Sequence, residues 1–277
     1  MRSTLIIISL IFSFDSISQN LFSNGDFENY SSCPSSMGQI NNAIGITSCT
    51  VTPDYYNSSC NFLPSDASGS TWCSMNAEAT IPSGNAFIGF FGGLFNSTSY
   101  QYESFILTLD SPTTAGQVYN IDFDMMTVDR PNGPCYAPAI GDCIDFGFYF
   151  YDSNNPINCP TGWQYSISSP PHPSPHASTG VGNISVGSWS SHTLSFTANG
   201  VYDRVLIYFF PNSNTGNSGC TSGTGKFFMD NLCIHPQGGT CETCSYTIEA
   251  GNNQSICEGN TATLNGSSAG GVIRSNC

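Results

Sequence analysis

The sequence predicts an all-β protein whose main domain is an antiparallel β-sandwich of jelly-roll type with long disulfide-bearing loops. Three observations support this fold class. Alternating or continuously apolar stretches recur along the chain, clusters of Gly, Pro, Asn and Ser separate them, and no segment shows the apolar period of a helix. The chain then continues into what we expect to be a truncated second β domain.

The N-terminus has the pattern of a cleavable secretory signal. A basic second residue is followed by an apolar run over 5–14 and by small residues at Ser16 and Ser18. The run is too short to cross a bilayer comfortably. We expect residues 1–18 to be removed and the mature protein to begin at Gln19; the alternative is a buried N-terminal strand.

Seven stretches predict the strands of the main domain, which spans 19–236. Residues 204–210 are almost continuously apolar, which is typical of a central strand covered on both faces. Residues 117–125 alternate, with one apolar face that we expect to be buried: Tyr119, Ile121, Phe123 and Met125. The seven predicted strands lie at 86–91, 105–109, 117–125, 144–151, 192–198, 204–210 and 227–234.

Two long insertions interrupt these strands. Residues 31–85 show little periodicity but contain several cysteines, so we expect cross-links at Cys33, Cys49, Cys60 and Cys73. Residues 152–187 are rich in Pro, Ser and Gly. Cys135 and Cys143 bracket a shorter loop that a disulfide could close. A loop as long as the first insertion is either functional or held by cross-links.

All 13 cysteines follow the signal, which favours an oxidising, extracellular location and several disulfides. An odd number leaves one thiol free, bonded to another chain, or separated from a partner beyond Cys277. From residue 237 the composition changes. We expect a hinge at 237–245 and the first strands of a second β domain at 246–277, a segment too short to bury a core.

The charge balance restricts the partners. Only 5 Lys and Arg stand against 19 Asp and Glu, which disfavours nucleic acids and anionic membranes. No later stretch is apolar for long enough to cross a membrane. Divalent cations and neutral polymers such as glycans suit an acidic, aromatic-rich surface. The alternative is that the acidity only keeps an extracellular protein soluble.

Two carboxylates lie at opposite ends of the main domain. Glu28 belongs to the segment NGDFE near the start, and Asp230 belongs to FFMDNL near the end. If the first and last strands are neighbours, the two side chains can share one hard cation. Alternatively, Glu28 caps a turn and Asp230 hydrogen-bonds the backbone at a strand edge.

Aromatic residues in or beside loops are candidates for stacking on sugar faces. Trp163 and Tyr165 lie in the second insertion, and Tyr136 and Tyr151 could extend the platform. The alternative is that these rings pack inward and fix the loops onto the sandwich.

Three further patterns predict no chemistry. His172 and His176 have a spacing found among zinc ligands, but the interleaved prolines preclude a helix, so we expect a solvated, extended loop. Cys241-x-x-Cys244 lies outside any redox fold and is expected to be oxidised. Pairs such as Asp122 and Asp124 could serve a glycosidase, yet carboxylates on one strand face usually point at solvent. We therefore expect no enzymatic activity.

Several segments resemble a known family. NGDFENYSSCP, TPDYYNSSC and KFFMDNLCI resemble the N-terminal module of large secreted surface proteins of Bacteroidetes bacteria, which are often called gliding-motility-associated and exported by the type IX secretion system. SICEGNTATLNGSS at 255–268 resembles the start of the Ig-like or PKD-like repeats that follow such modules.

The resemblance implies a jelly roll similar to galactose-binding-like domains and carbohydrate-binding modules. It also implies a structural calcium ion held by Glu28 and Asp230, with Asp26 and the backbone of Asn24 as weaker ligands. The expected function is a secreted, cell-surface-attached, non-catalytic module for adhesion or carbohydrate binding. The alternatives are a purely structural stalk or cap module and an accessory domain of an extracellular polysaccharide-degrading enzyme.

Overall fold

The computed structural model describes residues 20–50, 52–64, 81–96, 99–127, 144–160, 164–166, 172–211, 223–241, 245–250, 252–257 and 273–274. The chain divides into a large unit, Asn20–Gln237, and a second unit that includes Gly238–Cys277. The large unit therefore ends one residue after the boundary expected from the sequence.

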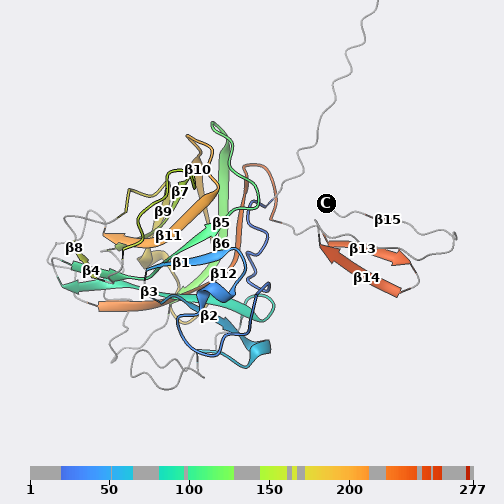
Figure 1. Cartoon of the computed structure of the whole chain (residues 1–277), viewed down its shortest axis with the longest axis horizontal. Coiled ribbons are helices and arrows are strands. Elements are labelled where there is room, and N and C mark those ends of the chain that lie inside the picture. The colour runs from blue at the N-terminus through green and yellow to red at the C-terminus, as the bar shows by residue number, and fades with distance from the viewer. Residues whose placement is uncertain are drawn as a thin grey trace, which may run out of the picture. The chain divides into compact units, whose positions relative to one another are not determined.

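The large unit is a sandwich of two sheets in which all strand pairings are antiparallel (Figure 1). In sheet order, the five-stranded sheet consists of β1 (Ile46–Thr50), β5 (Ser104–Thr108), β11 (Arg204–Pro211), β7 (Ile144–Tyr151) and β9 (Ala177–Gly180). The seven-stranded sheet consists of β10 (Ser190–Thr197), β6 (Val118–Thr127), β12 (Gly223–Pro236), β3 (Ala86–Asn96), β4 (Ser99–Tyr102) and β8 (Gln164–Ser166), with β2 (Asp54–Asn57) paired to β3. The predicted fold class is confirmed.

Each of the seven predicted segments forms a strand, and β7 has the predicted bounds. The sequence missed β1 and β2 in the first insertion, β8 and β9 in the second, and β4 between two predicted strands, because such strands of three to five residues show little periodicity. Short 3-10 turns occur at Ile40–Asn42, Ser58–Cys60 and Val181–Asn183.

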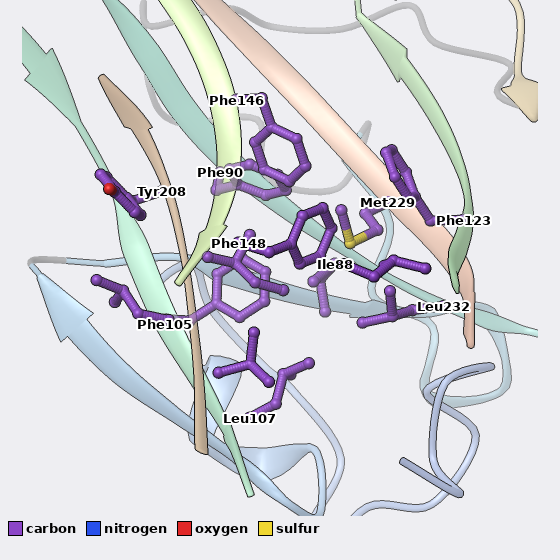
Figure 2. Packing of buried hydrophobic residues seen from close by; sticks show 14 of the residues in the cluster. Ile88, Phe90, Phe105, Leu107, Phe123, Phe146, Phe148, Tyr208, Met229 and Leu232 are labelled. Atoms are coloured by element: carbon purple, nitrogen blue, oxygen red, sulfur yellow. The ribbon is translucent and has the colours of Figure 1, made fainter. Parts of the chain in front are cut away.

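The main core lies between the two sheets and is rich in aromatic rings (Figure 2). Phe90 of β3 is at its centre, with ring centroids 5.3 Å from Phe105 and Phe209 and 5.7 Å from Phe146. The predicted inner face of β6 is buried, as expected from its alternation. Strand β11 lies between β5 and β7 and is buried on both faces over 205–209, which confirms it as a central strand.

A second apolar cluster covers the opposite face of the seven-stranded sheet. Phe228 alternates along β12 with the core residues Phe227 and Met229, so its side chain points away from the main core. There the rings of Tyr56 and Phe87 stack at 5.2 Å. Tyr56 comes from the first insertion, so this cluster packs that insertion against the sheet.

The start of the domain lies beside its last strand. The backbone N–H of Leu21 donates to the carbonyl of Ile234 at 2.7 Å, and the N–H of Leu232 donates to the carbonyl of Gly25 at 2.9 Å. The expectation that the first and last segments are neighbours is therefore confirmed.

Two disulfides fasten the insertions. Cys33 is bonded to Cys60, and Cys49 of β1 is bonded to Cys159, a separation of 110 residues. Cys233 and Cys241 are each part of a disulfide as well. Cys73, Cys135 and Cys143 lie outside the described residues. The expected cross-linking of the first insertion is thus confirmed at the three of its cysteines that are described.

The second unit contains a three-stranded antiparallel sheet, with β13 (Ser245–Ala250) between β14 (Asn252–Cys257) and β15 (Ile273–Arg274). Within the described part of the chain, no helix has the length and apolar character needed to cross a membrane.

Candidate functional site

Glu28 and Asp230 bind opposite ends of one short segment that leads into β3. The Glu28 carboxylate accepts hydrogen bonds from the N–H groups of Asn85 and Ala86, the latter at 2.7 Å. The Asp230 carboxylate accepts from the N–H and the hydroxyl of Ser83, at 3.3 and 3.4 Å. The two predicted cation ligands thus belong to the same corner of the fold, and they hold the chain between residues 83 and 86.

Asp230 has an environment that is unfavourable for a lone carboxylate. Its side chain is fully buried, and burial raises its pKa from 3.8 to about 7. Hydrogen bonds from Asn231 and Ser83 lower the pKa, whereas the nearby charge of Asp124 raises it. Asp230 forms no ion pair with any residue in the described part of the chain. A proton or a bound cation would remove the free-energy cost of burying this unpaired negative charge.

Three oxygen-bearing residues that sequence reasoning missed surround Asp230. The Asn231 amide donates to Asp124 at 2.7 Å, and the Ser83 hydroxyl donates to the Asn231 side chain at 2.6 Å. Asn231 has the left-handed φ of 52° in a β-bulge, where β12 loses its register with β6. In the sequence, the Asp230-Asn231 pair could have indicated this bulge, since Asn tolerates a left-handed backbone conformation. Carboxylate and amide oxygens suit Ca²⁺, so the residues present fit the ion.

The two weaker predicted ligands shape the N-terminal turn. The Asn24 amide donates to the carbonyls of Asn29 and Ile44, at 2.9 and 2.8 Å, and its side-chain oxygen accepts from the N–H of Asn29. Asp26 accepts from the N–H of Glu28 at 3.3 Å, and burial raises the pKa of Asp26. A part in cation binding stays a prediction for both residues.

Of the three predicted sugar-stacking residues, Tyr165 lies in the described part of the chain, whereas Trp163 and Tyr136 lie outside it. Tyr165 is on β8, the edge strand of the seven-stranded sheet, and it is half-buried. Its ring centroid is 4.8 Å from that of Tyr102 and 6.0 Å from that of Tyr100, both of which are buried. Burial raises the pKa of Tyr165 to about 12, so its phenol stays neutral. Tyr151, the fourth aromatic residue considered, is buried on β7.

The expectation of a solvated loop at His172 is wrong. The imidazole is only 6% exposed and lies against the rings of Tyr102 and Tyr208, at 5.8 and 5.2 Å between centroids. Burial lowers its pKa to about 4. His176 is half-buried and accepts a hydrogen bond from the N–H of Phe150. Within the described residues neither histidine belongs to a cluster of three metal-binding side chains.

The acid pair on β6 is more constrained than expected. Asp122 accepts from the hydroxyl of Thr193 at 2.6 Å and contacts the imidazole of His235 at 2.8 Å. Asp124 accepts from the hydroxyl of Ser191 at 2.6 Å. Both carboxylates lie partly exposed on the outer face of the sheet, as expected, and side chains of neighbouring strands also bind them.

No protein-family model matches the sequence, and a search of curated proteins finds no match. Among solved structures, the enzymatically active domain of tailspike protein 4 of bacteriophage CBA120 aligns at 14% identity and a TM-score of 0.34, over 78% of this chain and 21% of that one. The CBM22-1–GH10 modules of a Clostridium thermocellum endo-1,4-β-D-xylanase, complexed with xylohexaose, align at 11% identity and a TM-score of 0.31, over 60% and 24%.

The CBM22-1 xylan-binding domain of Paenibacillus barcinonensis Xyn10C aligns at 10% identity and a TM-score of 0.29, over 58% of this chain and 78% of that one. These structures include carbohydrate-binding modules as well as enzyme domains. This chain spans less than a quarter of the length of the first two. At such low identity and TM-scores, the ligand of this chain has to be argued from its own residues.

Proposed function

We propose that this protein is a secreted, non-catalytic module of the cell surface that binds carbohydrate, with a fold stabilised by a structural calcium ion. The observation that carries the proposal is the placement of Tyr165. Its ring lies on the edge strand of a sheet, half-exposed, on a base of two buried tyrosine rings. A ring held in this way loses little entropy when a flat apolar sugar face stacks on it.

The charge of the chain favours a neutral ligand. With 19 acidic and 5 basic side chains, the surface repels polyanions and is compatible with uncharged polysaccharides. The neutral Tyr165 phenol can also exchange hydrogen bonds with sugar hydroxyls. A role in the secreted surface proteins of Bacteroidetes, with type IX secretion and following Ig-like repeats, is part of the proposal and rests on the sequence motifs.

The calcium ion belongs to the same proposal as a structural component. Asp230, Glu28 and the oxygens of Asn231 and Ser83 are the groups that would hold it, at the corner where the first segment meets the last strand. Ca²⁺ would neutralise the buried charge of Asp230 and fasten this corner. It would supply no chemistry for turnover.

Binding to a panel of insoluble and soluble neutral polysaccharides, xylan among them, tests the proposed function. We expect the secreted protein to bind at least one of them, and Tyr165→Ala or Trp163→Ala to weaken that binding roughly 5- to 150-fold, if a sugar face stacks on one aromatic ring as strongly as a nucleic-acid base does, about 1–3 kcal/mol. Tyr30→Ala is the matched control, since Tyr30 is an exposed tyrosine just before the first insertion. Indifference of the protein to every polysaccharide would instead favour a purely structural stalk or cap module.

A further inference from the structure

Lys226 is the only lysine of the sequence, and it is buried on the outer face of the seven-stranded sheet, beneath the first insertion. It lies on β12, on the same face as Phe228, and is 3% exposed. Two acidic side chains share its environment: Asp54 of β2, which is 2% exposed, and Glu103, between β4 and β5, which is 8% exposed. A long cationic side chain is seldom buried in this way without a specific reason.

The three side chains form a compact triad. The Lys226 ammonium makes an ion pair and hydrogen bond with the Asp54 carboxylate, and its Nζ lies 3.9 Å from Oε2 of Glu103. Nζ also lies 4.4 Å from the centroid of the Phe91 ring. Gly89 leaves the space that the lysine needs, since a Cβ there would lie 3.0 Å from Cε of Lys226. Nucleophile and carboxyl group are thus held in contact, in apolar surroundings.

The hydrogen bonds around Asp54 distinguish its two oxygens. Oδ1 accepts from the backbone N–H of Gly38 at 2.6 Å, whereas Oδ2 faces Lys226 and accepts from the hydroxyl of Tyr56 at 2.9 Å. A backbone N–H directed at a carboxyl oxygen is the arrangement that stabilises negative charge on that oxygen during attack on the carbon. Gly38 has a φ of +78°, a conformation that favours glycine.

Glu103 is suited to carry a proton. Its carboxylate accepts from the hydroxyl of Thr52 and the N–H of Phe91, both at 2.9 Å, which fixes its orientation toward Nζ. Burial raises the pKa of Glu103 to about 7, with the charge of Lys226 opposing the rise and that of Asp54 adding to it. Near neutral pH the group therefore takes up and releases protons readily.

We propose that Lys226 and Asp54 condense into an intramolecular isopeptide bond, with Glu103 as the acid–base group. Transfer of one proton across the contact between Lys226 and Asp54 converts the ammonium and the carboxylate into an amine and a carboxylic acid. The neutral amine is a nucleophile. Because it is held in contact with the carboxyl group, the reaction can proceed without the chemical activation of the acid that amide synthesis between separate molecules requires.

The step balances without any co-reactant. The lone pair of Nζ attacks Cγ of Asp54, the C–N bond forms, and negative charge collects on Oδ1 beside the Gly38 N–H. Glu103 takes a proton from Nζ and returns it to Oδ2. The Cγ–Oδ2 bond then breaks, and one water molecule leaves. The product is an amide between Nζ and Cγ; nothing is oxidised or reduced.

Such a bond would join strands that are far apart in the sequence. Asp54 and Lys226 are separated by 172 residues, and β3 lies between β2 and β12 in the sheet. The bridge would tie the first insertion to the last strand of the domain and, unlike a disulfide, would survive reducing agents. A cross-link over so long a loop restricts the unfolded chain strongly.

Mass spectrometry of the secreted protein, fully reduced and denatured, tests the bond. We expect a mass lower by one water molecule than that calculated for the processed chain, no tryptic cleavage after Lys226, and a branched peptide that contains both Asp54 and Lys226. The full calculated mass, together with normal cleavage after Lys226, would overturn the proposal. This measurement on the natural protein does not depend on the folding of any variant.

Variants then identify the roles. Lys226→Met and Glu103→Gln should both keep the full mass, the first because the nucleophile is absent and the second because the proton carrier is absent. Asp203→Ala is the control, since Asp203 forms a partly exposed ion pair with Arg204 away from the triad, and it should still lose water. A Glu103→Gln protein that still loses water would remove Glu103 from the mechanism. Loss of water by Lys226→Met would disprove the bond itself.

Discussion

At Asp230 the structure combines full burial with a raised pKa, and this gives the calcium proposal a pH signature. The folded-state pKa of about 7 lies above the ordinary value of 3.8, so the protonated carboxyl is favoured by folding. Without calcium, this contribution to stability is complete at acidic pH below 3.8 and is lost as the pH rises through about 7. Calcium binds the ionised carboxylate of Asp230, so the stabilisation that calcium provides increases as the pH rises.

We therefore predict that EDTA lowers the melting temperature more at pH 8 than at pH 5. Asp230→Asn should abolish both the response to EDTA and most of this pH dependence, because the amide carries no charge in either state. Thermal melts of the two proteins, with EDTA and with added calcium, provide the measurement. Identical melts of the natural protein with and without chelator would remove calcium from the proposed function.

At the scale of elements, β12 organises the domain. At Gly223–Pro236 it is the longest strand in the part of the chain that the structure describes, and it pairs with β3 on one side and β6 on the other. Its inner residues enter the main core, while Lys226, Phe228 and Asp230 point to the outer face. The N-terminal segment then covers its last part through backbone hydrogen bonds. The proposed calcium ion and the proposed isopeptide bond both fasten other segments to this one strand.

The contact between the N-terminal segment and β12 depends on Gly25. A Cβ at this position would lie 1.6 Å from the carbonyl oxygen of Leu232, which is backbone and cannot rotate away. We predict that Gly25→Ala lowers the stability of the domain by several kcal/mol, on the scale of other severe backbone clashes. Gly180→Ala is the control, since the nearest atoms to its Cβ would be 3.7 Å away. Equal melting temperatures for the two variants would contradict the close approach.

At the scale of the whole molecule, covalent links determine how firmly the insertions are held. Cys49–Cys159 closes a loop of 110 residues and connects β1 to the segment between β7 and β8. We predict that the double variant Cys49→Ser, Cys159→Ser loses about 2–5 kcal/mol of unfolding free energy, measured by denaturant titration. A loss below about 0.5 kcal/mol would show that packing alone holds the insertion.

Much of the fold could be predicted from the sequence because strands of eight or more residues carry their own period. Strand β7 has the predicted bounds, and β11 was identified as central because its apolar run leaves no solvent face. The acidic segments that open and close the domain were also informative, since the N-terminal segment does lie beside β12.

The remaining features depend on partners far away in the sequence, and only the tertiary structure supplies them. His172 was expected in solvent because its neighbours are prolines, yet Tyr102 and Tyr208 bury it. Lys226 is conspicuous as a single lysine, but its partner Asp54 lies in an insertion without periodicity, 172 residues away. Local pattern determines which residues form strands and which face is apolar, because those depend on neighbours along the chain. The packing of the sheets determines which charged side chains become partners and how deeply they are buried.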